Sequence, residues 1–179
     1  MPANQIKEIP EEMFKVLPNL AEFDCSSTFI ETLPPSVGNC KKLYSLTLRE
    51  NNLHDLPDTL TECKELFRLD IASNVMTEFP AVVTKLTWLN RLYASHMMLT
   101  SLPEDIGNMK NLEKLLINGN CLTKLPASFA KLKNLEELSM SGVPWCGVSK
   151  SRKMVPYDVF LNFLKTRNID RWLEAHDEV

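Results

Sequence analysis

A chain of 179 residues is long enough for one ordinary domain or for a short repeat array with a continuous core. Hydrophobic residues make up 44% of the sequence and charged residues 24%, which excludes an intrinsically disordered chain. The formal net charge of -3 provides no overall basic field, so neither nucleic acid nor an anionic membrane is an expected partner.

The N-terminus lacks the charged start and apolar run of a secretory signal, and no stretch has the roughly 18 apolar residues of a membrane span. We therefore expect a soluble, cytoplasmic protein. Asn4-Gln5-Ile6 matches the tail of a repeat unit whose strand is missing, so the chain begins within a unit. Two interpretations follow: an array that starts at an exposed edge, or a segment of a longer array.

A dipeptide of the Leu-Pro type recurs along the chain at intervals of 23 residues. It occurs as Leu33-Pro34, Leu56-Pro57, Phe79-Pro80, Leu102-Pro103 and Leu125-Pro126. After a partial unit over 1–8, full units start at residues 9, 33, 56, 79, 102 and 125, and the first has one residue more than the others. Because so short a unit cannot bury its own apolar face, we expect the units to stack over residues 1–147.

Each unit contains the alternation of a short strand, as in Leu69 and Ile71, followed by a proline that stops the strand. Stacking then predicts an α/β repeat solenoid, with a parallel sheet on the concave side and irregular or 3₁₀ segments on the convex side. Polar side chains that follow the strands can pair backbone groups of the turning chain. This ladder comprises Asn51, Asn74 and Asn120 and is interrupted at Thr28, Met97 and Val143.

The pattern resembles the leucine-rich-repeat family, whose LxxLxLxxNxL segment is matched by Leu43-Leu46-Leu48-Asn51-Leu53 and its equivalents in two other units. The Leu-Pro-x-x-Ile/Val-Gly-Asn form is similar to an intracellular subgroup that includes the Ras-pathway Shoc scaffold, Scribble, Erbin and the plant intracellular Ras-group proteins. This resemblance implies a curved solenoid that binds proteins, in a context of small-GTPase signalling.

The C-terminal residues 148–179 follow a different pattern, because the period ends after Val143-Pro144-Trp145. Apolar residues from Val159 to Leu164 have helical spacing, so we expect a helical cap and tail. Val143-Pro144-Trp145-Cys146 loosely resembles the start of the cysteine-rich cap of extracellular leucine-rich-repeat proteins, but three of the four cysteines of that cap are missing. The longer first unit keeps an extracellular receptor fragment as a minor alternative.

The five cysteines and three histidines show neither metal-ligand nor catalytic spacing, and the glycines form no phosphate-binding loop. We therefore predict no catalytic residues, no metal and no cofactor. Cys25, Cys40 and Cys63 take core positions. Cys40 and Cys63 are equivalent residues of adjacent units, close enough for a disulfide, but free thiols are the expected state.

Function is expected on the exposed side of the strands, where three columns of residues run along the array. The first contains Glu22, Ser45, Arg68, Arg91, Lys114 and Glu137; the second contains Asp24, Thr47, Asp70, Tyr93, Leu116 and Ser139; the third contains Ser26, Arg49, Ala72, Ser95, Asn118 and Ser141. Arg68, Arg91 and Lys114 form a run of like charges, with Tyr93 and Leu116 as apolar neighbours.

Two interpretations of the basic run remain open: a site for a partner that carries carboxylates, or a solvated column whose long side chains spread into water while Asp70 and Glu50 neutralise their neighbours. Under the first, the chain is a non-catalytic scaffold or adaptor whose partner has an acidic surface. The alternative is a recognition segment of a larger kinase, GTPase-containing protein or immune receptor. The predicted protein-binding residues are Arg49, Arg68, Asp70, Arg91, Tyr93, His96, Lys114, Leu116 and Asn118.

Overall fold

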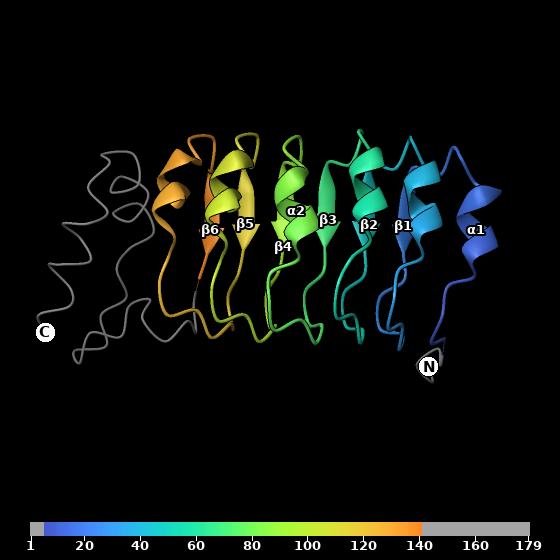
Figure 1. The fold of residues 1–179 in the computed structure, drawn as a ribbon, viewed down its shortest axis with the longest axis horizontal. Helices are drawn as coiled ribbons and strands as arrows, with labels where there is room; N and C mark the ends of the chain where they lie inside the picture. The colour runs from blue at the N-terminus through green and yellow to red at the C-terminus, as the bar shows by residue number, and fades with distance from the viewer. Residues whose placement is uncertain (1–5, 141–179) are drawn as a thin grey trace, which may run out of the picture.

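A computed structural model describes residues 6–140, which form one stacked array (Figure 1). Six strands of three residues make a parallel sheet in which each strand pairs with its neighbours in sequence order. The strands are β1 (Glu22–Asp24), β2 (Ser45–Thr47), β3 (Arg68–Asp70), β4 (Arg91–Tyr93), β5 (Lys114–Leu116) and β6 (Glu137–Ser139). This confirms the predicted solenoid with its sheet on the concave side.

Short helical turns cover the opposite, convex side, one for each strand (Figure 1). They are α1 (Glu11–Lys15), η1 (Pro35–Asn39), η2 (Asp58–Glu62), α2 (Ala81–Lys85), η3 (Glu104–Asn108) and η4 (Ala127–Lys131). A proline stands immediately before or at the start of each turn, because its fixed φ suits the first helical position and it needs no N–H partner there. Four turns are 3₁₀, as predicted, and two close as single α-helical turns.

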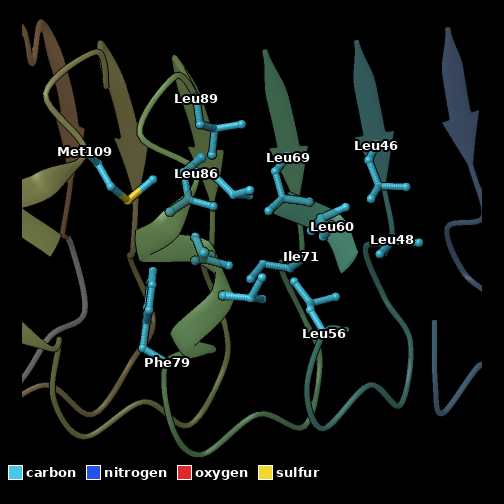
Figure 2. Packing of buried hydrophobic residues seen from close by; sticks show 14 of the residues in the cluster. Leu46, Leu48, Leu56, Leu60, Leu69, Ile71, Phe79, Leu86, Leu89 and Met109 are labelled. Atoms are coloured by element: carbon cyan, nitrogen blue, oxygen red, sulfur yellow. The ribbon is translucent and has the colours of Figure 1, made fainter. Parts of the chain in front are cut away.

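The leucines of the repeat point between the sheet and the convex turns and form one continuous core (Figure 2). Leu46, Leu69, Leu92 and Leu115 are fully buried at equivalent strand positions. Phe23 and Leu20 of the first unit are only partly buried against this core. Core burial therefore decreases at the β1 end of the sheet, which pairs with β2 on one side only among the described residues.

The asparagine ladder is present and makes the predicted backbone contacts. Asn74 donates from Nδ2 to the carbonyls of Leu48 and Ile71, at 3.0 and 2.9 Å, and its Oδ1 accepts the N–H of Leu53 at 2.9 Å. Asn51 and Asn120 make equivalent bonds. Where the ladder is interrupted, Thr28 substitutes in part by donating to the carbonyl of Cys25 at 3.2 Å. The third interruption, Val143, lies outside the described residues.

Four cysteines lie in the described range, and all are free thiols. Cys40 donates to the carbonyl of Leu17 at 3.3 Å and Cys63 to that of Val37 at 3.4 Å, so both thiols are satisfied inside the core. Burial raises the pKa of Cys40, and it raises the pKa of Cys63 to about 11. Cys146, His176 and the predicted cap over 148–179 lie outside the described residues.

These environments predict which thiols react in the native protein. At pH 8 a disulfide reagent such as dithionitrobenzoate should modify the exposed Cys121 fast, and Cys40 and Cys63 only after unfolding. With a pKa of about 11, roughly one Cys63 side chain in a thousand is the reactive thiolate at that pH. Peptide mapping by mass spectrometry assigns the sites, and Cys121→Ser should remove the fast contribution of the described residues. Equal rates at Cys63 and Cys121, or a Cys40–Cys63 disulfide, contradict this prediction.

Candidate functional site

The exposed columns predicted on the concave face follow the pairing of the strands. Arg68 is in register with Arg91, and Arg91 is in register with Lys114. Tyr93 and Leu116 face each other in the same way in the second column. Because neighbouring parallel strands are about 4.8 Å apart, these five side chains lie within one compact area of the sheet. We call this area the basic patch.

The cations of the basic patch rest on aromatic rings. Arg68 and Lys114 lie over the ring of Tyr93, at 5.0 and 5.6 Å from its centroid, and approach it from the two neighbouring strands. Arg91 lies over Phe67 at 5.2 Å. Each such contact contributes about 0.5–1 kcal/mol at an exposed site. The rings therefore hold three like charges side by side, which offsets part of their mutual repulsion.

Carboxylates neutralise only part of the basic patch. Arg68 pairs with Asp70 at 3.4 Å, as one interpretation of the sequence expected, and Lys114 pairs with Glu137 at 2.7 Å. Arg91 is exposed and has no carboxylate within ion-pair distance in residues 6–140. Its guanidinium is the uncompensated positive charge at the centre of the patch.

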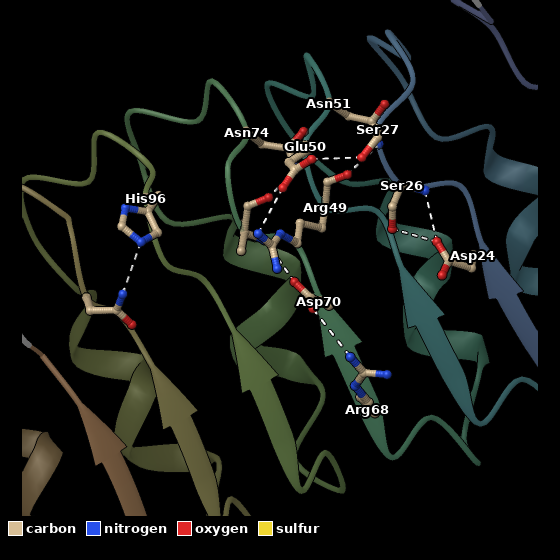
Figure 3. Close-up of polar contacts among 12 residues, drawn as sticks. Asp24, Ser26, Ser27, Arg49, Glu50, Asn51, Arg68, Asp70, Asn74 and His96 are labelled. Carbon is tan, nitrogen blue, oxygen red and sulfur yellow. Dashed lines mark hydrogen bonds and ion pairs between the residues drawn. The ribbon is translucent and has the colours of Figure 1, made fainter. Parts of the chain in front are cut away.

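Asp70 is the most buried charged side chain of the site, with 6% of its surface exposed. Its Oδ1 accepts the N–H of Ala72 at 3.2 Å, and Figure 3 shows Arg68 reaching its other oxygen. Burial raises the pKa of Asp70, while the Ala72 N–H and the Arg68 charge oppose that effect. Asp70 therefore fixes the position of Arg68, and its ionised form is disfavoured by desolvation.

Arg49 and Glu50 form a separate pair at the carboxyl ends of the strands (Figure 3). The guanidinium of Arg49 lies 2.8 Å from Glu50, and Ser27 donates its hydroxyl to the same carboxylate at 2.7 Å. The Ser27 hydrogen bond and then the Arg49 charge lower the pKa of Glu50. Glu50 thus neutralises its neighbour Arg49, as the second interpretation of the sequence expected.

His96 and Asn118 form a third group, beside the ends of β4 and β5. Nδ2 of Asn118 lies 3.2 Å from Nε2 of His96, and its Oδ1 accepts the hydroxyl of Ser95 at 2.7 Å. His96 has a positive φ of 53°. Ser27, Glu50 and Ser73, at the equivalent positions of other units, also have positive φ values. The next equivalent residue, Gly119, lies under the His96 ring, where an added Cβ would collide with Nδ1. This glycine makes room for the histidine.

The predicted site residues thus fall into two areas. Arg68, Arg91, Tyr93, Lys114 and Leu116 gather in the basic patch, with Asp70 at its edge. Arg49, His96 and Asn118 form the second area, which lies beyond the carboxyl ends of their strands. Whether either area binds a partner stays a prediction.

Sequence analysis missed two aromatic residues of the concave face. Tyr44 and Phe67 stack with ring centroids 5.0 Å apart and planes only 4° from parallel. They stand one residue before the first exposed column, at positions 23 residues apart, where Ala21 and Asn90 are their equivalents. Two aromatic residues at the same position of adjacent units could have predicted this stack. Phe67 is also the ring beneath Arg91, so this pair belongs to the site.

Metal ligands and membrane-spanning helices are both absent from residues 6–140. Within that range no three His, Cys, Asp or Glu side chains gather as a metal ion would require. No helix in the same range has the length and apolar character needed to cross a membrane.

Comparison with known proteins finds leucine-rich repeats in one part of the sequence and similar folds among solved structures. Residues 110–145 match the family model described as leucine-rich repeats in two copies. No curated protein sequence matches the chain significantly. A leucine-rich-repeat protein of Leptospira interrogans shares 30% identity over 75% of this chain and 34% of its own, with a TM-score of 0.73.

Two further structures have the same fold. The plant peptide hormone receptor RGFR1, solved in complex with RGF2, has 30% identity over 74% of this chain and 22% of its own, with a TM-score of 0.63. An internalin, InlF of Listeria monocytogenes, has 23% identity over 75% of this chain and 38% of its own, with a TM-score of 0.64. This chain therefore spans between 22% and 38% of the three matched chains.

The stacked units, the parallel sheet and the asparagine ladder agree with these matches. Proteins with this fold generally mediate interactions between proteins. Residues 110–145 thus match leucine-rich repeats, and the described residues adopt the same solenoid fold as the structural neighbours.

Proposed function

We propose that this chain is a non-catalytic scaffold or adaptor that binds a protein or peptide segment on its concave sheet. The observation that carries the proposal is the basic patch, in which three cations are held on two aromatic rings while Arg91 has no carboxylate within the described range. Arg and Tyr side chains are enriched among the residues that dominate binding energies at protein interfaces. The partner segment carries carboxylates that reach Arg91.

A peptide-like partner is consistent with one structural neighbour. The plant receptor is a peptide hormone receptor solved with RGF2, at 30% identity to this chain. The whole receptor's activity is not carried over, since this chain spans 22% of it. We propose a cytoplasmic location and a context of small-GTPase signalling, on the resemblance to the Shoc and plant Ras-group proteins. A recognition segment of a larger kinase, GTPase-containing protein or receptor is the alternative.

Site-specific photo-cross-linking tests the proposal even while the partner is unidentified. A benzophenone amino acid at Leu116 stands beside Tyr93 and removes neither a cation nor a ring of the patch. A probe at the exposed Lys133, outside the sheet, is the matched control. We expect a specific product from Leu116 that disappears when Arg91→Glu is combined with the probe. A product obtained from Lys133 alone, or one that is insensitive to Arg91, means that the basic patch is not the site.

A further inference from the structure

The aromatic stack of the concave face is closed at one end by a cation. The rings of Tyr44 and Phe67 are parallel, and the two residues stand immediately before the neighbouring strands β2 and β3, so the rings stack along the array. Arg91 stands on the strand after Phe67 and lies over its ring, whereas Tyr44 precedes the strand on the other side. The contact between Arg91 and Phe67 is therefore an example, within this protein, of a guanidinium group packed on a ring of the stack.

The other end of the stack is open. On the other side of Tyr44 lies the unit that contains β1, in which the equivalent residue is Ala21. The carbonyl of Ala21 accepts the N–H of Tyr44 at 2.7 Å, so the two residues are direct neighbours. Ala21 is exposed and has only a methyl group, and Tyr44 is 47% exposed. The Tyr44 side chain is thus exposed to solvent beside a residue that has no ring to stack on it.

The strand next to Tyr44, β1, carries two exposed carboxylates. Glu22 follows Ala21, is exposed and is in register with Ser45; no ion pair is found for it within residues 6–140. Asp24, two residues farther along β1, is also exposed. The strand β1 itself contains no basic residue. The β1 side of Tyr44 therefore carries acidic residues, whereas the β3 side carries Arg68 of the basic patch.

We propose that the open face of Tyr44, over Ala21, binds an arginine side chain of the protein partner whose guanidinium stacks on the ring and pairs with Glu22. A planar guanidinium stacks on an aromatic face and binds a carboxylate through two N–H groups at once, which an ammonium group cannot do. The two acidic side chains favour a cation over a neutral ring. This inference rests on the proposed function, because it concerns the same partner and the same sheet.

The register of the strands sets the distance between the two charges of the partner. Glu22 is on β1 and Arg91 is on β4, three strands farther along the sheet. At about 4.8 Å between neighbouring strands, the two residues are about 14 Å apart. An extended segment spans that distance with about four residues. The recognised segment carries an arginine and, about four residues away, one or two carboxylates.

Synthetic peptides test this arrangement. The probe is the capped peptide Arg-Gly-Ser-Gly-Asp-Asp, and its comparator has citrulline, which is uncharged and nearly isosteric, in place of arginine. Amide shifts of the ¹⁵N-labelled full chain give both affinities by titration. We expect the arginine peptide to bind roughly three- to thirtyfold tighter than the citrulline peptide, from one exposed cation–ring contact and one exposed ion pair.

Variants assign that difference to the open face. Tyr44→Leu and Glu22→Gln should each reduce it, whereas Glu31→Gln, which removes an exposed carboxylate beyond the carboxyl end of β1, should leave it unchanged. Equal affinities of the two peptides, or a difference that persists in Tyr44→Leu, overturn the arginine site. If both peptides bind equally and Arg91→Gln weakens both, the basic patch is a binding site but the proposed arginine site is not. If Arg91→Gln has no effect, the basic patch fails; if neither peptide shifts any amide, both proposals fail.

Discussion

Replacing Asn74 with alanine lowers the free energy of unfolding by about 3–5 kcal/mol, the largest loss expected from any polar side chain of the ladder. Asn74 is 4% exposed, and its amide joins two neighbouring strands to the turn that follows them. Without it the carbonyl of Ile71 and the N–H of Leu53 lose their side-chain partner inside the core. Each buried group left unpaired costs about 1–3 kcal/mol.

Two variants serve as controls for Asn74→Ala. Asn52→Ala truncates a half-buried asparagine next to the ladder residue Asn51, and we expect less than about 0.5 kcal/mol of change. Asn74→Thr should be intermediate, because Thr28 makes one of the ladder bonds at the equivalent position of the first unit. Urea midpoints followed by circular dichroism give the comparison. An Asn74→Ala midpoint equal to that of Asn52→Ala would show that the ladder does not stabilise the sheet.

The sequence predicts the fold well because nearly every repeated residue has one structural role. The exposed columns follow from the period alone, since a shift by one residue would place Leu69 in solvent and Arg68 in the core. The turn type on the convex side was not fully predictable. A 3₁₀ turn and a single α-helical turn differ by one residue in hydrogen-bond span, so α2 closes differently from η1 although both follow a proline.

The site was predicted less completely than the fold. The register identified Arg68, Arg91 and Lys114, but side-chain direction decides which charge is neutralised. Asp70 pairs with Arg68 and Glu50 pairs with its neighbour Arg49, but the lack of a carboxylate partner for Arg91 within residues 6–140 follows only from the structure. The rings beneath the cations depend on contacts between units, which no property of a single unit reveals.

Charge is distributed unevenly along the concave face, and this limits the possible partners. The strand β1 presents Glu22 and Asp24, whereas β3 to β5 present Arg68, Arg91 and Lys114. A partner of uniform charge would be repelled at one end of the sheet. This distribution fits the segment proposed above, whose charges change sign along its length.

Replacing Arg68, Arg91 and Lys114 together with glutamine should weaken binding of the cross-linked partner by about a hundredfold or more, because truncating one member of a desolvated charge pair costs about 2–5 kcal/mol. Glutamine is preferable to glutamate at Arg68 and Lys114. Their neighbours Asp70 and Glu137 would otherwise face a like charge, and a folding defect could be mistaken for lost binding. Titration of the purified partner by calorimetry gives the affinities.

Arg91 is the best single residue for testing the site, since it forms no ion pair within the described range that a substitution would break. Arg91→Glu should account for most of the triple variant's effect, and Arg91→Lys should recover part of it, because a lysine keeps the charge but not the flat stacking on Phe67. Lys133→Glu makes the same change of charge on an exposed residue outside the sheet and should leave the affinity unchanged. If Lys133→Glu weakens binding as much as Arg91→Glu, the attraction is a long-range effect of net charge. Only a loss confined to Arg91 and its neighbours makes the ring-bound cations of the concave sheet the site of recognition.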